Sequence, residues 1–142
     1  MRDFSNVKRV VVKVGTNLLS SKDGIDKNRI KIIVDEIAAL KEMGYQVILV
    51  SSGAVGMGAK RLKHNNPVVY IAMRQACAAI GQPLLMSAYQ SEFDKHNMIC
   101  SQVLITRSVL SNRTSYKNLR SSVSTLLALG VVPIFNENDV VS

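Results

Sequence analysis

The chain has 142 residues, of which 47% are hydrophobic and 20% charged, a composition typical of a globular domain with its own core. No apolar run reaches the roughly 20 residues of a membrane span, and residues 1–8 lack the apolar stretch of a secretory signal. The sequence therefore predicts a cytoplasmic protein without a membrane partner.

The net charge of +8 favours anionic partners. The cations are spread along the chain, however, and only 5% of residues are aromatic, so few side chains could stack on nucleobases. We expect no nucleic-acid partner. The two cysteines, Cys77 and Cys100, have the spacing of neither a zinc site nor a redox pair, and we predict that they are buried, reduced and not metal ligands.

The first fifty residues predict a strand, a helix and a second strand. Residues 10–14 form a short β-branched run typical of a buried strand. Apolar residues then recur at helical spacing over residues 30–40, with Asp26 as the helix cap and Gly44 as its stop. Residues 45–50 are continuously apolar, as in a strand that is covered on both faces. This order is typical of a βαβ unit with parallel strands and a right-handed crossover.

The rest of the chain continues the alternation after a polar, glycine-rich stretch at residues 51–58. Helix, strand, helix and strand are predicted in turn over residues 68–95, 99–105, 112–129 and 131–135. The first of these helices is expected to be interrupted at residues 81–83, and Gly130 is expected to end the second. The predicted fold class is α/β, with a mostly parallel sheet and helices on both faces, and residues 1–142 form one domain or a part of one.

Three predicted strands end in small, polar or charged residues. The residues at these strand ends are Lys13, Gly15, Thr16 and Asn17, then Ser51, Ser52 and Gly53, then Asn136, Glu137, Asn138 and Asp139. The carboxyl ends of parallel strands meet at one edge of a sheet, where open α/β sheets bind their ligands. A lysine beside glycine, hydroxyls and amides at a helix start, and an acid and amide cluster together suit a zwitterion such as an amino acid.

Each group alone also has a simpler explanation. Lys13 could be a strand-end lysine that extends into water, Ser51 and Ser52 could cap a helix, and residues 136–139 could form an ordinary turn. Their expected convergence at one edge favours a binding site. The glycines of residues 53–58 do not have the dinucleotide-binding order, and no Walker A motif or G-x-S-x-G elbow occurs in the chain.

Four segments resemble the amino acid kinase family, in particular its glutamate 5-kinase branch. These are residues 11–17 (VVKVGTN), 50–55 (VSSGAV), 78–82 (AAIGQ) and 132–139 (VPIFNEND). Their order and spacing match that branch along nearly the whole chain, and together they are far more specific than any one alone. The resemblance implies a three-layer α/β/α fold and ATP-dependent phosphorylation of the γ-carboxylate of L-glutamate, the first step toward proline.

Roles follow by position from this resemblance. Lys13 would help to neutralise the transferring phosphoryl group, and Gly15 and Thr16 would let the nucleotide phosphates approach the backbone. Glutamate would be held by Ser52, Gly53, Ala54, Asn136 and Asp139, with Asp139 as the partner of its α-ammonium. The resemblance also implies Mg²⁺ bridging the ATP phosphates, a homo-oligomer, and L-proline as a possible feedback inhibitor.

The resemblance also implies parts that do not occur in these residues. In the family, a further acceptor loop, the adenine pocket and a second phosphate-binding lysine come after the position of Asp139. We therefore expect this chain to supply the glutamate-binding lobe and to lack turnover alone. A non-catalytic glutamate or proline sensor, a basic nucleic-acid-binding domain, and a kinase for carbamate or N-acetylglutamate stay open as alternatives.

Overall fold

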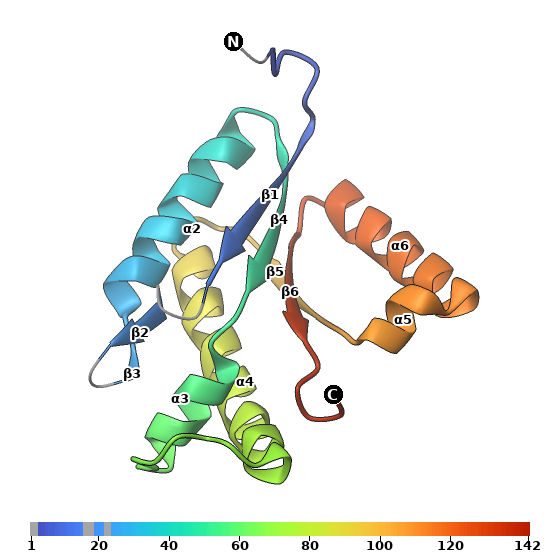
Figure 1. The fold of residues 1–142 in the computed structure, drawn as a ribbon. Helices are drawn as coiled ribbons and strands as arrows, with labels where there is room; N and C mark the ends of the chain where they lie inside the picture. Colours follow the sequence, from blue (N-terminus) through green and yellow to red (C-terminus); the bar gives the residue numbers. More distant parts are fainter. Residues whose placement is uncertain (1–2, 16–18, 22–23) are drawn as a thin grey trace.

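The computed structural model describes residues 3–15, 19–21 and 24–142 (Figure 1). Within these residues a four-stranded parallel sheet has the order β1-β4-β6-β5. Its strands are β1 (Arg9–Val14), β4 (Gln46–Ser51), β6 (Val132–Glu137) and β5 (Cys100–Ile105). A short antiparallel pair, β2 (Ser20–Ser21) and β3 (Gly24–Ile25), lies outside this sheet.

Helices connect successive strands and cover both faces of the sheet. β1 is joined to β4 by α2 (Lys27–Glu42), β4 to β5 by α3 (Ala54–Arg61) and α4 (Ile71–Asp94), and β5 to β6 by α5 (Arg107–Ser111) and α6 (Arg113–Ala128). Right-handed crossovers that run first toward β5 and then back to β6 must place their helices on opposite faces. Figure 1 shows this arrangement, with α2, α3 and α4 on one side of the sheet and α5 and α6 on the other. The predicted α/β/α architecture is confirmed.

The main core lies between the sheet and the helix pair α2 and α4. Ile30, Val34 and Ile37 of α2 are fully buried there, against sheet residues such as Leu49 and Ile134. From α4 come Leu85, Tyr89 and Phe93, which recur every four residues and therefore lie on one helix face. Each large apolar side chain buried in this way contributes roughly 1.5–3 kcal/mol of transfer free energy.

The predicted cap Asp26 and the predicted helix stops Gly44 and Gly130 are confirmed, and Asn112 caps α6 as well. The side chain of Asp26 accepts a hydrogen bond from the amide of Arg29 at 3.1 Å, and that of Asn112 accepts one from Ser115 at 2.9 Å. Gly44 and Gly130 follow α2 and α6 with φ of +89° and +77°, a left-handed conformation that glycine adopts at little cost.

The predicted interruption at residues 81–83 is wrong, because α4 runs unbroken through Pro83. Proline removes one backbone donor from the helix ladder. The surrounding packing of α4 against α2, α3 and the sheet nevertheless holds one continuous helix. The short elements β2, β3 and α5 were not predicted either, since two to five residues are too few to show a period.

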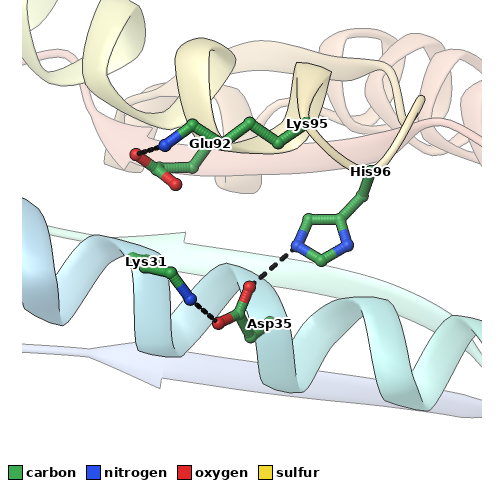
Figure 2. Close-up of polar contacts among 5 residues, drawn as sticks. All are labelled: Lys31, Asp35, Glu92, Lys95 and His96. Carbon is green, nitrogen blue, oxygen red and sulfur yellow. Dashed lines mark hydrogen bonds and ion pairs between the residues drawn. The ribbon is translucent and has the colours of Figure 1, made fainter.

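Polar contacts also link the end of α4 to α2 (Figure 2). Nε2 of His96 lies 2.8 Å from Oδ1 of Asp35, whose other carboxylate oxygen accepts a hydrogen bond from Lys31. The hydrogen bond from Lys31, followed by that from His96, lowers the pKa of Asp35. These side chains are largely exposed to solvent, so their ion pairs contribute little to the stability of the fold. No helix of the described residues is long and apolar enough to cross a membrane.

Two glycines allow α3 and α4 to pack at backbone contact distance. A Cβ atom added at Gly81 would lie 1.7 Å from the carbonyl oxygen of Ala54, and one added at Gly58 would lie 1.8 Å from that of Cys77. Since both obstacles are backbone atoms, neither can move without shifting a helix. The glycine of the segment 78–82 is therefore required by packing and not by a turn.

We predict that Gly81→Ala destabilises the protein by about 2 kcal/mol or more, because overpacking against backbone exceeds the gain of about 1 kcal/mol in helix propensity. Gly56→Ala is the matched control, since a Cβ there meets nothing within 4 Å and α3 would gain propensity. Urea unfolding at neutral pH measures both effects. Equal midpoints for Gly81→Ala and the unsubstituted protein would contradict the packing account.

Candidate functional site

The carboxyl ends of β1, β4 and β6 lie side by side at one edge of the sheet. Val14 pairs with Ser51, and Val50 pairs with Phe135, so Asn136, near the end of β6, lies next to the end of β4. The connection that leaves β4 covers one face, whereas the connection that leaves β5, on the other side of β6, covers the opposite face. This reversal between neighbouring strands opens the crevice where α/β sheets bind ligands.

The end of β4 is held by its two serines. Ser51 is 3% exposed, and its Oγ lies 3.0 Å from the phenol oxygen of Tyr89 on α4. Ser52 Oγ donates a hydrogen bond of 3.0 Å to the carbonyl of Val14 at the end of β1. The residue that caps α3 is Gly53, with no side-chain hydrogen bond, so the alternative that the serines cap this helix is wrong. The serines instead tie three elements together at the edge.

The first turn of α3 points its amides toward this edge. Gly53 has φ of +105°, which suits glycine, and its carbonyl accepts the helical hydrogen bond from Met57 at 3.0 Å. The amides of Ala54 and the next two residues precede that first helical bond. Such amides, at the positive end of the helix dipole, are a suitable binding place for a carboxylate or phosphate.

A relay of side-chain amides fixes the end of β6. Asn136 is 7% exposed, and its Nδ2 donates a 2.8 Å hydrogen bond to Gln82 of α4. Gln82 in turn donates to Gln102 of β5 at 3.1 Å, and Asn136 Oδ1 accepts from the amide of Glu137 at 2.9 Å. Gln82 and Gln102 were not predicted as site residues, although Gln82 belongs to the segment 78–82. Asn136 is thus held in one orientation.

The carboxylate of Asp139 is paired within the chain. Its Oδ1 lies 3.2 Å from Nη2 of Arg74 on α4, and the Asp139 side chain is only 13% exposed. Arg74 carries no pattern in the sequence that would have marked it as a neighbour of this edge. An ammonium ligand at Asp139 would therefore share the carboxylate with, or displace, the guanidinium group.

The residues predicted to contact phosphate belong to the end of β1. Strand alternation places Lys13 on the face opposite Val14, where it is exposed, and no carboxylate of the described residues forms an ion pair with it. Space around Gly15 is open, since an added Cβ would meet nothing within 4 Å. Thr16 and Asn17 lie outside the described residues. The edge thus offers a cation, helix amides and a carboxylate from three strands.

Comparison with known proteins accounts for this arrangement. The sequence profile described as "Amino acid kinase family" matches residues 8–142. The chain belongs to the amino acid kinase family. Its fold is also that of the solved Giardia carbamate kinase, with a TM-score of 0.60 over 93% of this chain and 58% of that one, at 17% identity. At that identity the likeness concerns the fold alone.

Closer relatives carry the name glutamate 5-kinase. The chain is 44% identical over 139 residues to that of Syntrophus aciditrophicus and 45% identical over 143 residues to glutamate 5-kinase 2 of Bacillus subtilis. It is 42% identical over 142 residues to that of Thermus thermophilus. These alignments cover 98% to 100% of this chain but only 36% to 38% of the relatives. The chain therefore spans little more than a third of their length.

We predict that Tyr89→Phe destabilises the protein by about 1 to 2 kcal/mol at neutral pH, because the buried Ser51 hydroxyl loses the shorter of its two hydrogen bonds. Burial raises the pKa of Tyr89 from 10.0 to about 12, while its hydrogen bond with Ser51 lowers it. The folded state therefore favours the neutral phenol, a contribution that is complete below pH 10 and lost as the pH rises through about 12.

Urea unfolding between neutral pH and about pH 11 measures this difference. The stability gap between the unsubstituted protein and Tyr89→Phe should narrow as the pH rises. Tyr116→Phe, which alters a tyrosine that is 48% exposed, is the control. It should change neither the stability at neutral pH nor the dependence of stability on pH. A gap that stays constant with pH would show that Tyr89 is not held neutral by burial.

Proposed function

We propose that this chain supplies the glutamate-binding part of a glutamate 5-kinase, which transfers the γ-phosphoryl group of ATP to the γ-carboxylate of L-glutamate. The observation that carries the proposal is the juxtaposition of the Ser52 to Ala54 turn with Asn136 and Asp139 at one sheet edge. Relatives at 42% to 46% identity with that name support the choice of substrate.

A glutamate zwitterion presents two carboxylates and one ammonium group, and the edge offers a partner for each sign of charge. Ser52, Gly53 and Ala54 lie at the start of α3, where amides and the helix dipole favour a carboxylate. Asp139 would receive the α-ammonium group in a charge-assisted hydrogen bond. The orientation of Asn136, fixed by Gln82, would supply a further polar contact without ordering cost on binding.

The transfer itself is a displacement at phosphorus. A γ-carboxylate oxygen of glutamate forms the new bond to the γ-phosphorus of ATP, the bond to the bridging oxygen breaks, and ADP leaves with that oxygen. Lys13 would stabilise the negative charge on the transferring group, and Gly15 and Thr16 would let the phosphates approach the backbone. Mg²⁺ would enter with the ATP phosphates and would supply further charge neutralisation there.

The proposal extends to the setting of the reaction. It includes the first step toward proline, with L-proline as a possible competitor at the same edge, a homo-oligomer, and a cytoplasmic location where ATP and glutamate are both present. The adenine pocket is assigned to residues beyond those of this chain. We therefore expect the 142-residue polypeptide to bind glutamate without binding Mg-ATP. If the protein were a glutamate sensor and not a kinase, a longer version of the chain would not bind ATP either.

We predict that Asp139→Asn weakens L-glutamate binding by about 2 kcal/mol, roughly 30-fold, since the ammonium group loses its charged partner. Isothermal titration of L-glutamate into the 142-residue chain measures the change. Arg74→Gln is the matched control, because it removes the same ion pair but keeps the Asp139 carboxylate.

The two variants distinguish a role of Asp139 in glutamate binding from a role in the fold. If Asp139 binds the ammonium group, Arg74→Gln should bind glutamate as tightly as the unsubstituted chain or more tightly. Equal losses in both variants would mean that the ion pair serves the fold only, and unchanged binding in Asp139→Asn would remove Asp139 from the site.

A further inference from the structure

We propose a second ligand site, separate from the sheet edge, that binds a small amphiphilic anion with an aliphatic body and a phosphate-type head group. The site is a pocket of about 790 Å³ between the start of α2, the end of α3 and the second half of α4. Its cationic lining, which we name the basic pocket, consists of Lys27, Lys60, Arg61, Lys63 and Lys95.

The charges around the basic pocket are almost all of one sign. Glu92 is the one acid among the described lining residues, and its Oε1 already lies 2.7 Å from Nζ of Lys95, as Figure 2 shows. No carboxylate of the described part of the chain pairs with the other four cations, which come from α2, α3 and the residues just after α3. Among the described residues, several cations thus line one hollow without a carboxylate partner, which favours a multiply charged anion.

Helix electrostatics explain only some of these cations. Lys60 and Arg61 occupy the last turn of α3, where positive charge is favourable with the helix dipole. Lys27, by contrast, is the first residue of α2 and directly follows the capping residue Asp26, whose carboxylate forms an ion pair with Arg29. The helix dipole does not favour a cation at this position, and Asp26 is already paired with Arg29, so the charge of Lys27 is available to an anion that both helices contact.

The floor of the basic pocket is aliphatic. Leu84 of α4 is 36% exposed, and Ile25 and Ala88 are half-buried, so these three lining residues offer apolar surface to a ligand. No aromatic side chain is among the described lining residues, so a nucleobase would find no stacking partner. An aliphatic body fits this surface better, and the volume is in the range of small-molecule sites.

The basic pocket and the sheet edge lie at opposite ends of α3. Gly53 and Ala54 begin the helix at the edge, whereas Lys60 and Arg61 end it at the pocket, and eight residues of helix span about 12 Å. A ligand at one end therefore need not contact the other. The glutamate proposal and this one can fail independently.

The test uses the 142-residue chain and three probes in isothermal titration: octyl phosphate below its micellar concentration, inorganic phosphate for charge alone, and octyl glucoside for the aliphatic body alone. The double variant Lys27→Gln with Lys60→Gln, the pocket variant, removes one cation at the start of α2 and one at the end of α3. Lys8→Gln with Lys117→Gln is the matched control, because it lowers the net charge equally at positions outside the pocket.

We expect octyl phosphate to bind at least about tenfold more tightly than either other probe, and the pocket variant to lose about tenfold or more while the control stays within about twofold. L-Glutamate binding should be equal in both variants. Equal weakening by both double variants, or inorganic phosphate binding as tightly as octyl phosphate, would overturn the proposal. Binding to vesicles that contain phosphatidic acid without binding of octyl phosphate would do the same, since a membrane surface would then be the partner.

Discussion

The close contact between α3 and α4 is the constraint on which the rest of the structure depends. Only glycine at positions 58 and 81 leaves room for the carbonyls of Cys77 and Ala54. That contact fixes the start of α3 at the end of β4. It also brings the middle of α4 under the sheet edge, where Tyr89 reaches Ser51 and Gln82 reaches Asn136. A looser helix pair would separate the groups that the proposed glutamate site requires.

The polar residues of the edge form hydrogen bonds and an ion pair within the chain. Ser52 holds the end of β1, Asn136 is oriented by an amide relay, and Asp139 is paired with Arg74. This network restricts the edge before a ligand arrives, which lowers the ordering cost of binding. It also means that glutamate must compete with one internal ion pair. Lys13, by contrast, forms no ion pair with a described carboxylate.

Much of the architecture could be predicted from sequence because its signals are local. Asp26 and Asn112 cap their helices, and continuous apolar runs marked the strands of a parallel sheet. The break at residues 81–83 was predicted wrongly because glycine and proline favour turns locally, whereas here the reason for Gly81 is a neighbouring helix. The contacts of Tyr89, Gln102 and Arg74 could not be predicted, since they depend on side chains 20 to 65 residues apart meeting in space.

The central claim is that the carboxyl edge of β1, β4 and β6 binds an amino acid. The most direct test is a titration of the ¹⁵N-labelled chain with L-glutamate, followed by the amide resonances in two-dimensional NMR. The account predicts that the shifts concentrate at Ser52, Gly53, Ala54, Asn136 and Asp139, and that Lys60 and Lys63 at the far end of α3 stay unchanged. Shifts confined to the basic pocket, or none at saturating glutamate, would contradict it.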